Sequence, residues 1–200
     1  MITVQRMEAP PFDLRSALRY GGVHTEELCW QEMAEACYAE LAPHLTYRVC
    51  YGEFGLTREG KSLDLGFAAV DSAALAKSLT GCDRVLLFAA TVGLEPDRRI
   101  ARYAVTSPTK ALWMQAVGSE RVESLCDAFC AERAKAYGEE GRQLRPRFSP
   151  GYGDLPLALQ REIFGVLNCS ARIGVSLNES LLMSPSKSVT ALMGILPPKA

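Results

Sequence analysis

The sequence predicts an α+β fold, in which an antiparallel sheet with hairpins packs against several helices. Three observations support this class. Segments with strand periodicity and segments with helical periodicity interleave without the regular alternation of a parallel βαβ fold. Two pairs of strand-like segments are separated by short turns, which is typical of antiparallel pairing. One apolar stripe at helical spacing extends over about residues 109–137 and predicts a single long helix.

The N-terminal region contains two predicted helices. The first is a short helix over residues 13–20 that stops at Gly21-Gly22. The second begins at Thr25, an N-cap residue followed by two acidic residues, and ends before Pro43. Its apolar side chains share one stripe: Trp30, Met33, Cys37 and Leu41.

Strands dominate the next region. Apolar and polar residues alternate over 46–54, which predicts a strand, and we expect 62–70 to be its hairpin partner after a turn at 58–61. Asp71 is the expected cap of a short helix that ends at Leu79. The continuous apolar run of residues 84–90 predicts a strand buried on both faces.

The second half of the chain is richer in helix. A helix is expected from Glu95-Pro96, since proline is favoured in the first turn, and the long helix follows. A further helix is expected to open at Asp154 and Pro156 and to end at Asn168. The tail, residues 180–195, resembles a hairpin with two apolar arms around a Pro/Ser turn.

Composition restricts the class of protein. The chain has 200 residues, 48% of them apolar, and 22 basic residues nearly balance 23 acidic ones, so the net charge is −1. That length fits a single domain, residues 1–200. A near-neutral chain has no electrostatic attraction for nucleic acid or for a membrane surface, and neither a transmembrane run nor an apolar signal core occurs. We therefore expect a cytoplasmic protein that binds no nucleic acid and no membrane.

Common catalytic and metal-binding motifs are missing from the sequence. The seven cysteines include no CxxC pair, and only two histidines are present, so we expect no metal site and no Ser-His-Asp triad, and we assign no catalytic residue. Cys126 and Cys130 lie one helical turn apart among small residues, which favours a core position over a reactive pair.

The loop over residues 145–154 is the best candidate site. It presents Arg147, whose guanidinium suits a carboxylate or phosphate, and Tyr152, whose ring offers a stacking surface. Gly151 and Gly153 would let a ligand approach the main chain. The loop thus predicts a site for a small anion-bearing molecule. An equally weighted alternative is a structural loop whose arginine pairs with a surface acid.

A set of motifs in one order makes the sequence recognisable. The chain contains the pattern Arg-x-x-x-Gly-Tyr over residues 147–152, then a helix, then Gly-x-x-Leu-x-Glu-Ser over 174–180 and a Pro-x-x-Ser-Val turn over 185–189. This order resembles the activation domain of cobalamin-dependent methionine synthase. The match is good over residues 80–196 and loose over residues 1–80. No Asp-x-His-x-x-Gly cobalamin motif is present, so the resemblance is to a free-standing form of the domain.

The resemblance implies a site for S-adenosylmethionine. Arg147 would hold the ligand's carboxylate, while Ser149, Gly151 and Tyr152 would contact the remainder. The acid that reaches the ligand's amino group in the family aligns with Ser124 here, so its neighbours on the long helix, Glu120 and Glu123, are the expected replacements. Met193 stands where the family has an aromatic residue.

Some candidate residues keep two interpretations. Glu123 lies on a face of small residues, so it would need a cation. The cation is either the ammonium or sulfonium of a ligand, or one of Arg121, Arg99 and Arg102 at a helix crossing. Asp154 is expected to be a helix cap and Lys187 to face solvent. The cluster of Arg98, Arg99 and Arg102 forms either a docking face for an acidic partner or a solvated helix face.

The function implied by the resemblance is reactivation of a corrinoid. The chain would bind S-adenosylmethionine and support reductive methylation of cobalamin carried by a partner, either a methionine synthase module or another corrinoid protein. A flavodoxin-like protein is the expected electron donor. The alternatives are a non-catalytic S-adenosylmethionine-binding accessory subunit and an assembly subunit of a split corrinoid methyltransferase.

Overall fold

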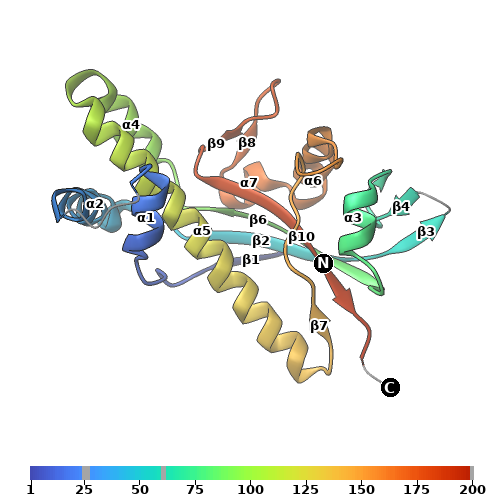
Figure 1. The fold of residues 1–200 in the computed structure, drawn as a ribbon. Helices are drawn as coiled ribbons and strands as arrows, with labels where there is room; N and C mark the ends of the chain where they lie inside the picture. The colour runs from blue at the N-terminus through green and yellow to red at the C-terminus, as the bar shows by residue number, and fades with distance from the viewer. Residues whose placement is uncertain (24–27, 60–61, 199–200) are drawn as a thin grey trace.

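A computed structural model describes residues 1–23, 28–59 and 62–198 of the chain. Its centre is a five-stranded antiparallel sheet in the order β1-β2-β6-β10-β7 (Figure 1). The strands of this sheet are β1 (Thr3–Arg6), β2 (Arg48–Gly55), β6 (Arg84–Thr91), β7 (Gln143–Leu144) and β10 (Ser188–Leu196). Two small antiparallel sheets lie beside it, formed by β3 (Thr57–Glu59), β4 (Ser62–Asp64) and β5 (Ala69–Val70), and by β8 (Ser176–Leu177) and β9 (Met183–Ser184).

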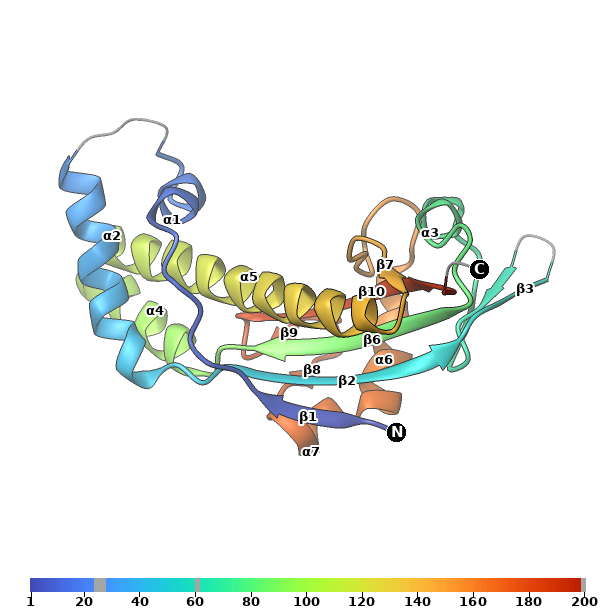
Figure 2. The same cartoon turned by 90° about the horizontal axis from the view of Figure 1, so that it is seen from below.

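Helices cover both faces of the sheet. The long helix α5 crosses one face, and α6 and α7 lie on the other (Figure 2). At one end of α5, helices α1, α2 and α4 pack around it. The helices are α1 (Leu14–Tyr20), α2 (Leu28–Leu41), α3 (Ala73–Ser78), α4 (Glu95–Thr106), α5 (Pro108–Glu139), α6 (Gln160–Leu167) and α7 (Cys169–Ile173), with 3₁₀ turns at Ala42–His44 and Leu157–Leu159.

Strand β6 shows why the sheet is buried on both faces. Leu87 and Ala89 point into a core shared with α6 and α7, whereas Leu86 and Phe88 point into a core shared with α5. This alternation is the period of a strand, so a continuous apolar run serves two cores at once. The predicted α+β class, the antiparallel sheet and the long helix are confirmed.

A third apolar cluster joins α1 and α2 to the N-terminal part of α5. Trp113 is buried there and stacks on Trp30, with ring centroids 5.9 Å apart. The expected cap at Thr25, with Glu26 and Glu27, lies outside the described residues. Within the described residues, no helix combines the length and the hydropathy that crossing a membrane requires.

The partners predicted for two strands are wrong. β2 pairs with β1 and β6, and not with residues 62–70. That segment forms β4 and β5, which pair with each other across a turn in which Asp64 accepts from the N–H of Gly66. Residues 57–59 and 62–64 pair with each other as β3 and β4, and the middle of the predicted turn, residues 60–61, lies outside the described residues. The strand β1 was not predicted.

The tail is also arranged differently from the prediction. β9 pairs with β8, while β10 pairs with β6 along eight residues and with β7 at its end. Residues of β10 are buried almost throughout, so a central position in the main sheet buries more apolar surface than a local hairpin would.

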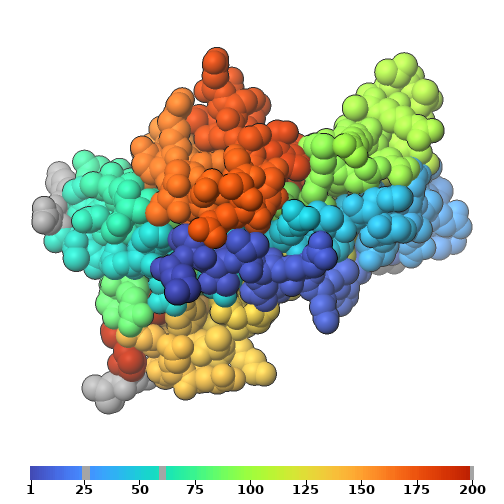
Figure 3. Space-filling view, turned by 180° about the vertical axis from the view of Figure 1, so that it is seen from behind, coloured from blue at the N-terminus to red at the C-terminus, as the bar shows by residue number. Residues whose placement is uncertain are grey.

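Helix boundaries follow the predictions closely, with two corrections. Ser72, and not Asp71, caps α3, since its hydroxyl accepts from the N–H of Leu75 at 3.0 Å. The helix expected from residue 154 begins at Gln160, after the 3₁₀ turn, and ends at Asn168 in the left-handed conformation as predicted. From behind, the segment with α6 and α7, in orange, covers the middle of the molecule above β1, and α4 projects at one end (Figure 3).

Candidate functional site

A cavity of about 410 Å³ lies where the loop before α6 passes the edge of β10. Its volume is in the range of small-molecule sites. The lining combines charged, polar and apolar side chains from α5, the loop, α6, β9 and β10: Glu123, Arg147, Phe148, Ser149, Pro150, Tyr152, Gln160, Met183, Ser188, Val189 and Thr190. Four of the six residues predicted for the site, Glu123, Arg147, Ser149 and Tyr152, therefore lie together.

Arg147 pairs with two acids of α5, of which Glu123 lines the cavity and Asp127 does not. Nη2 of Arg147 lies 2.7 Å from Oε2 of Glu123 and 2.9 Å from Oδ1 of Asp127. The partners expected for Glu123 are thus corrected, because Arg121 pairs with Glu120 and Arg99 pairs with acids outside the cavity. A guanidinium has five N–H donors, so these two contacts leave it able to bind a further anion.

The loop is closed on itself by main-chain hydrogen bonds. The N–H of Gly151 donates to the carbonyl of Leu155 at 2.9 Å, and the N–H of Leu155 donates to the carbonyl of Tyr152 at 3.0 Å. Gly151 and Gly153 have φ of 89° and 58°, a region that strongly favours glycine. This conformation leaves the side chain of Tyr152 69% exposed at the cavity mouth.

Asp154 attaches the loop to α3. Its carboxylate accepts hydrogen bonds from the N–H of Ala73 at 2.7 Å and of Ala74 at 3.1 Å, and from the hydroxyl of Ser72. The bonds from Ser72 and from these backbone groups hold the pKa of Asp154 below its usual value. Asp154 is therefore a helix cap, as predicted, but of α3 and not of the helix that follows it.

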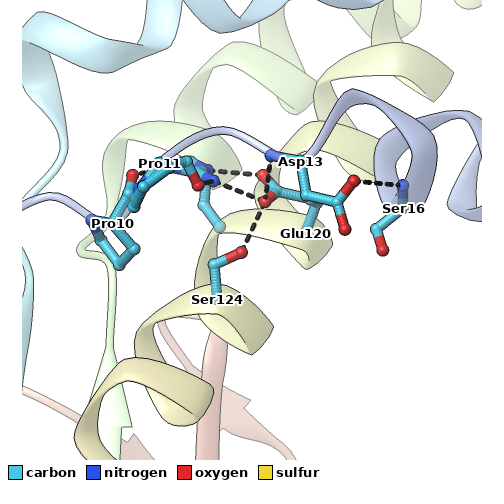
Figure 4. A network of polar contacts seen from close by, with 7 residues as sticks. Pro10, Pro11, Asp13, Ser16, Glu120 and Ser124 are labelled. Atoms are coloured by element: carbon cyan, nitrogen blue, oxygen red, sulfur yellow. Dashed lines mark hydrogen bonds and ion pairs between the residues drawn. The ribbon is translucent and has the colours of Figure 1, made fainter.

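Glu120 lies in a separate buried network (Figure 4). Its carboxylate pairs with Arg121 and accepts from the N–H of Asp13 at 3.1 Å and from the hydroxyl of Ser124 at 2.6 Å. Arg121 also donates to the carbonyls of Pro10 and Pro11, and both charged side chains are fully buried. Glu120 is not among the cavity residues, and its contacts attach the N-terminal segment to α5.

Three polar residues that line the cavity, Gln160, Ser188 and Thr190, were not predicted as site residues. Gln160 and Thr190 are 5% and 2% exposed, and the Gln160 Oε1 and Thr190 Oγ1 atoms are buried without a hydrogen-bond partner among the described residues. The one sequence signal is that Gln160 occupies an apolar position, since it shares the stripe of Ile163 and Leu167 on the buried face of α6.

The structure is similar to a solved domain of known type. It superposes on the MetH reactivation domain bound to AdoHcy with a TM-score of 0.71 and 18% identity, covering 99% of this chain and 80% of that chain. The chain has the fold of the MetH reactivation domain. The sequence matches no protein-family profile and no curated protein. The expected resemblance is thus confirmed for the fold, including the loosely matching first 80 residues.

Within this reactivation-domain fold, Lys187 is buried, so its predicted exposure is wrong. It is 5% exposed, its Nζ donates to the hydroxyl of Ser119 at 3.0 Å, and its methylenes cross Gly118. Burial lowers the pKa of Lys187, against the opposing field of Asp97. A Cβ at position 118 would lie 3.1 Å from the Lys187 chain, which explains a glycine at this point of α5.

The basic cluster on α4 is largely neutralised. Arg99 pairs with Glu40 and Glu95, and Arg98 lies 3.7 Å from Glu95. Glu40 also binds Lys110 and Tyr103; burial raises its pKa, but these partners and Arg99 together lower the value to about 2. The face is therefore a network of ion pairs that joins α4 to α2.

The cysteines of α5 are in the core, as predicted. Cys126 is buried and Cys130 packs against the same cluster. Burial raises the pKa of Cys130 to about 11, and it raises the pKa of Cys126 further. Both thiols are therefore protonated at neutral pH. Because the thiolate is the nucleophilic form of cysteine, both residues fill the core and are not reactive.

Proposed function

We propose that the chain binds S-adenosylmethionine in the cavity beside Arg147 and supports the reductive methylation of a corrinoid carried by a partner protein. The observation that carries the proposal is the pair of opposite charges in the cavity wall, Arg147 and Glu123 at 2.7 Å. A guanidinium next to a carboxylate is the complement of an α-amino acid group, in which an ammonium lies next to a carboxylate. The fold, shared with a domain solved with AdoHcy, supports the same ligand class.

Each proposed residue has one task. Arg147 binds the carboxylate of the ligand, Glu123 accepts from its ammonium, and Tyr152 covers it at the cavity mouth. Ser149 and Gly151 present the loop backbone beside it. These groups hold the methyl group of the sulfonium in a fixed direction, and a fixed reactant is how a protein accelerates a transfer without acid or base residues.

The reaction needs two further components. The corrinoid of the partner supplies the cobalt that accepts the methyl group, once a donor has delivered one electron. The carbon–sulfur bond breaks with its electron pair going to sulfur, so S-adenosylhomocysteine is released, and the reduced cobalt of the partner would supply both electrons of the new bond to the methyl group. We propose a cobalamin-dependent methionine synthase module or a related methyltransferase as the partner, a flavodoxin-like protein as the donor, and the cytoplasm as the location.

Calorimetry and methyl transfer test the proposal in sequence. The isolated chain should bind S-adenosylmethionine and S-adenosylhomocysteine, and radiolabelled methyl should then appear on the corrinoid of a reduced partner protein. Failure to bind at millimolar ligand would refute the ligand site. Binding without transfer, with several corrinoid partners and a chemical reductant, would support the accessory-subunit alternative.

A further inference from the structure

The cavity that contains the Arg147–Glu123 pair is also lined by polar atoms with unused hydrogen-bonding capacity. Oε1 of Gln160 and Oγ1 of Thr190 are buried, lack partners among the described residues, and belong to residues that line this cavity. Buried side-chain polar atoms are almost always hydrogen-bonded in folded proteins. Leftover acceptors in a ligand cavity are therefore positions where the ligand provides the partner.

The backbone of β10 offers further polar groups at Thr190. Phe148 and Leu192 exchange two hydrogen bonds, of 2.8 and 2.9 Å, and the carbonyl of Lys187 accepts from Val92 of β6 at 3.2 Å. In an antiparallel sheet, alternate residues direct their N–H and C=O to the same edge. The N–H and C=O of Thr190 thus point to the same edge as those of Leu192, two residues before the bridge that Leu192 forms with Phe148.

We propose that Gln160 and Thr190 recognise the adenine base of the ligand, an inference that rests on the proposed function. The carboxamide of glutamine matches the edge of adenine, because its oxygen accepts from the exocyclic amine while its nitrogen donates to a ring nitrogen. Oε1 of Gln160 therefore accepts from the 6-amino group. Thr190, through its hydroxyl and its backbone, bonds the neighbouring polar atoms of the nucleoside.

This assignment predicts selectivity for adenine over hypoxanthine. Hypoxanthine carries a carbonyl in place of the amine, so two acceptors would face each other. A site built to bond an N–H discriminates strongly against a ligand that lacks it. We expect S-adenosylhomocysteine to bind at least about tenfold more tightly than S-inosylhomocysteine, which is the effect of one lost hydrogen bond between buried groups.

The test measures both ligands by calorimetry on the full chain. Gln160→Met keeps the side-chain length and removes the acceptor, so it should weaken S-adenosylhomocysteine binding and bring the ratio of the two affinities close to one. Gln160→Glu, which retains an acceptor oxygen, should keep the preference for adenine. Thr190→Val should weaken both ligands. Gln115→Met, the same change at an exposed position of α5, should behave as the parent chain.

The outcomes separate this inference from the proposed function. If the parent chain binds neither ligand, the proposed function fails and the inference fails with it. If the parent binds both equally, or if folded Gln160→Met keeps the preference, base recognition by Gln160 is overturned while the ligand site stands. Should Gln160→Met fail to fold, loss of the preference in Gln160→Glu would overturn the inference.

Discussion

Arg147 and Glu123 satisfy each other across the cavity wall, with Nη2 of the arginine 2.7 Å from Oε2 of the glutamate. The two side chains are 27% and 36% exposed, so the pair is partly screened by solvent. Ion pairs of this kind contribute only about 0–1 kcal/mol to stability. A zwitterionic ligand can therefore replace this contact by one bond to each residue, and the charge balance of the site is unchanged.

Replacing Arg147 by alanine should weaken S-adenosylmethionine binding with little change in melting temperature. A charged hydrogen bond to a ligand contributes about 1.5–3 kcal/mol, or roughly 10- to 100-fold in affinity. Calorimetry and thermal unfolding check the two halves of this prediction. Arg145→Ala is the matched control, because Arg145 donates to the carbonyl of Thr80 and is not a cavity residue. Unchanged affinity in Arg147→Ala would assign the residue a structural role.

Replacing Glu123 by glutamine should affect only ligands that carry the amino group. The change removes the negative charge that the ammonium requires, at nearly constant shape. We expect about tenfold weaker binding of S-adenosylhomocysteine, and no change for the analogue that lacks the amino group. Equal losses for both compounds would show that Glu123 acts by positioning Arg147 and not by contact with the ligand.

Tyr152 should contribute to binding through its ring. Its side chain is 69% exposed, so substitution should leave stability unchanged. Tyr152→Ala should weaken S-adenosylmethionine binding by more than about tenfold, roughly the 1.4 kcal/mol of one aromatic contact, and Tyr152→Phe should weaken it clearly less. Methyl transfer should fall in the same order. If the alanine variant binds normally but no longer forms the partner complex, Tyr152 belongs to a docking surface.

The sequence was sufficient for the local structure and insufficient for the strand pairing. The long helix was predicted over 109–137 and extends over 108–139, because a helical stripe is a property of neighbouring residues. The partners of β2 and β10 depend on residues far away in the chain. For these strands, nearby turns predicted hairpins with neighbouring segments. In the structure both strands instead pair with β6, which is buried on both faces of the main sheet.

The same distinction applies to the candidate site. The loop with Arg147 and Tyr152 could be found because its motif is contiguous. The sequence could not show that Gln160 and Thr190 line the cavity or that Lys187 is buried. Each of these features depends on which side chains face the residue in the folded protein. Glu120 is one turn from Ser124 and three residues from Glu123, but its carboxylate is directed to the N-terminal segment, and spacing along the helix does not show that direction.

Glu120 should be required for stability. Removing one member of a fully buried ion pair leaves an unpaired charge and typically costs about 3–5 kcal/mol. Glu120→Ala should lower the free energy of unfolding by this amount, measured by chemical denaturation, because Arg121 is then without its carboxylate. Ser124→Ala, which removes one hydrogen bond to Glu120, should cost only about 1 kcal/mol. Loss of ligand binding in folded Glu120→Ala, with unchanged stability, would instead place Glu120 in the ligand site.

Lys187 should destabilise the fold at neutral pH. Its ammonium is buried beside Ser119, and burial lowers its pKa below the ordinary value of 10.5. The unfolded chain therefore binds the proton more tightly than the folded one. The loss of stability caused by burying the ammonium is fully present at pH values below the pKa of Lys187 in the folded protein. It disappears as the pH rises from the folded pKa to 10.5.

Lys187→Met keeps the methylenes that cross Gly118 and removes the charge. It should raise the free energy of unfolding at pH 7 by on the order of 1 kcal/mol. The difference from the parent chain should shrink as the pH approaches 10.5, the ordinary value for lysine. Denaturation curves at several pH values measure this difference, with Lys135→Met on the exposed face of α5 as the control that should show none of it. A variant less stable than the parent by the same amount at every pH would contradict the prediction, because the Lys187–Ser119 contact would then outweigh the cost of burying the charge.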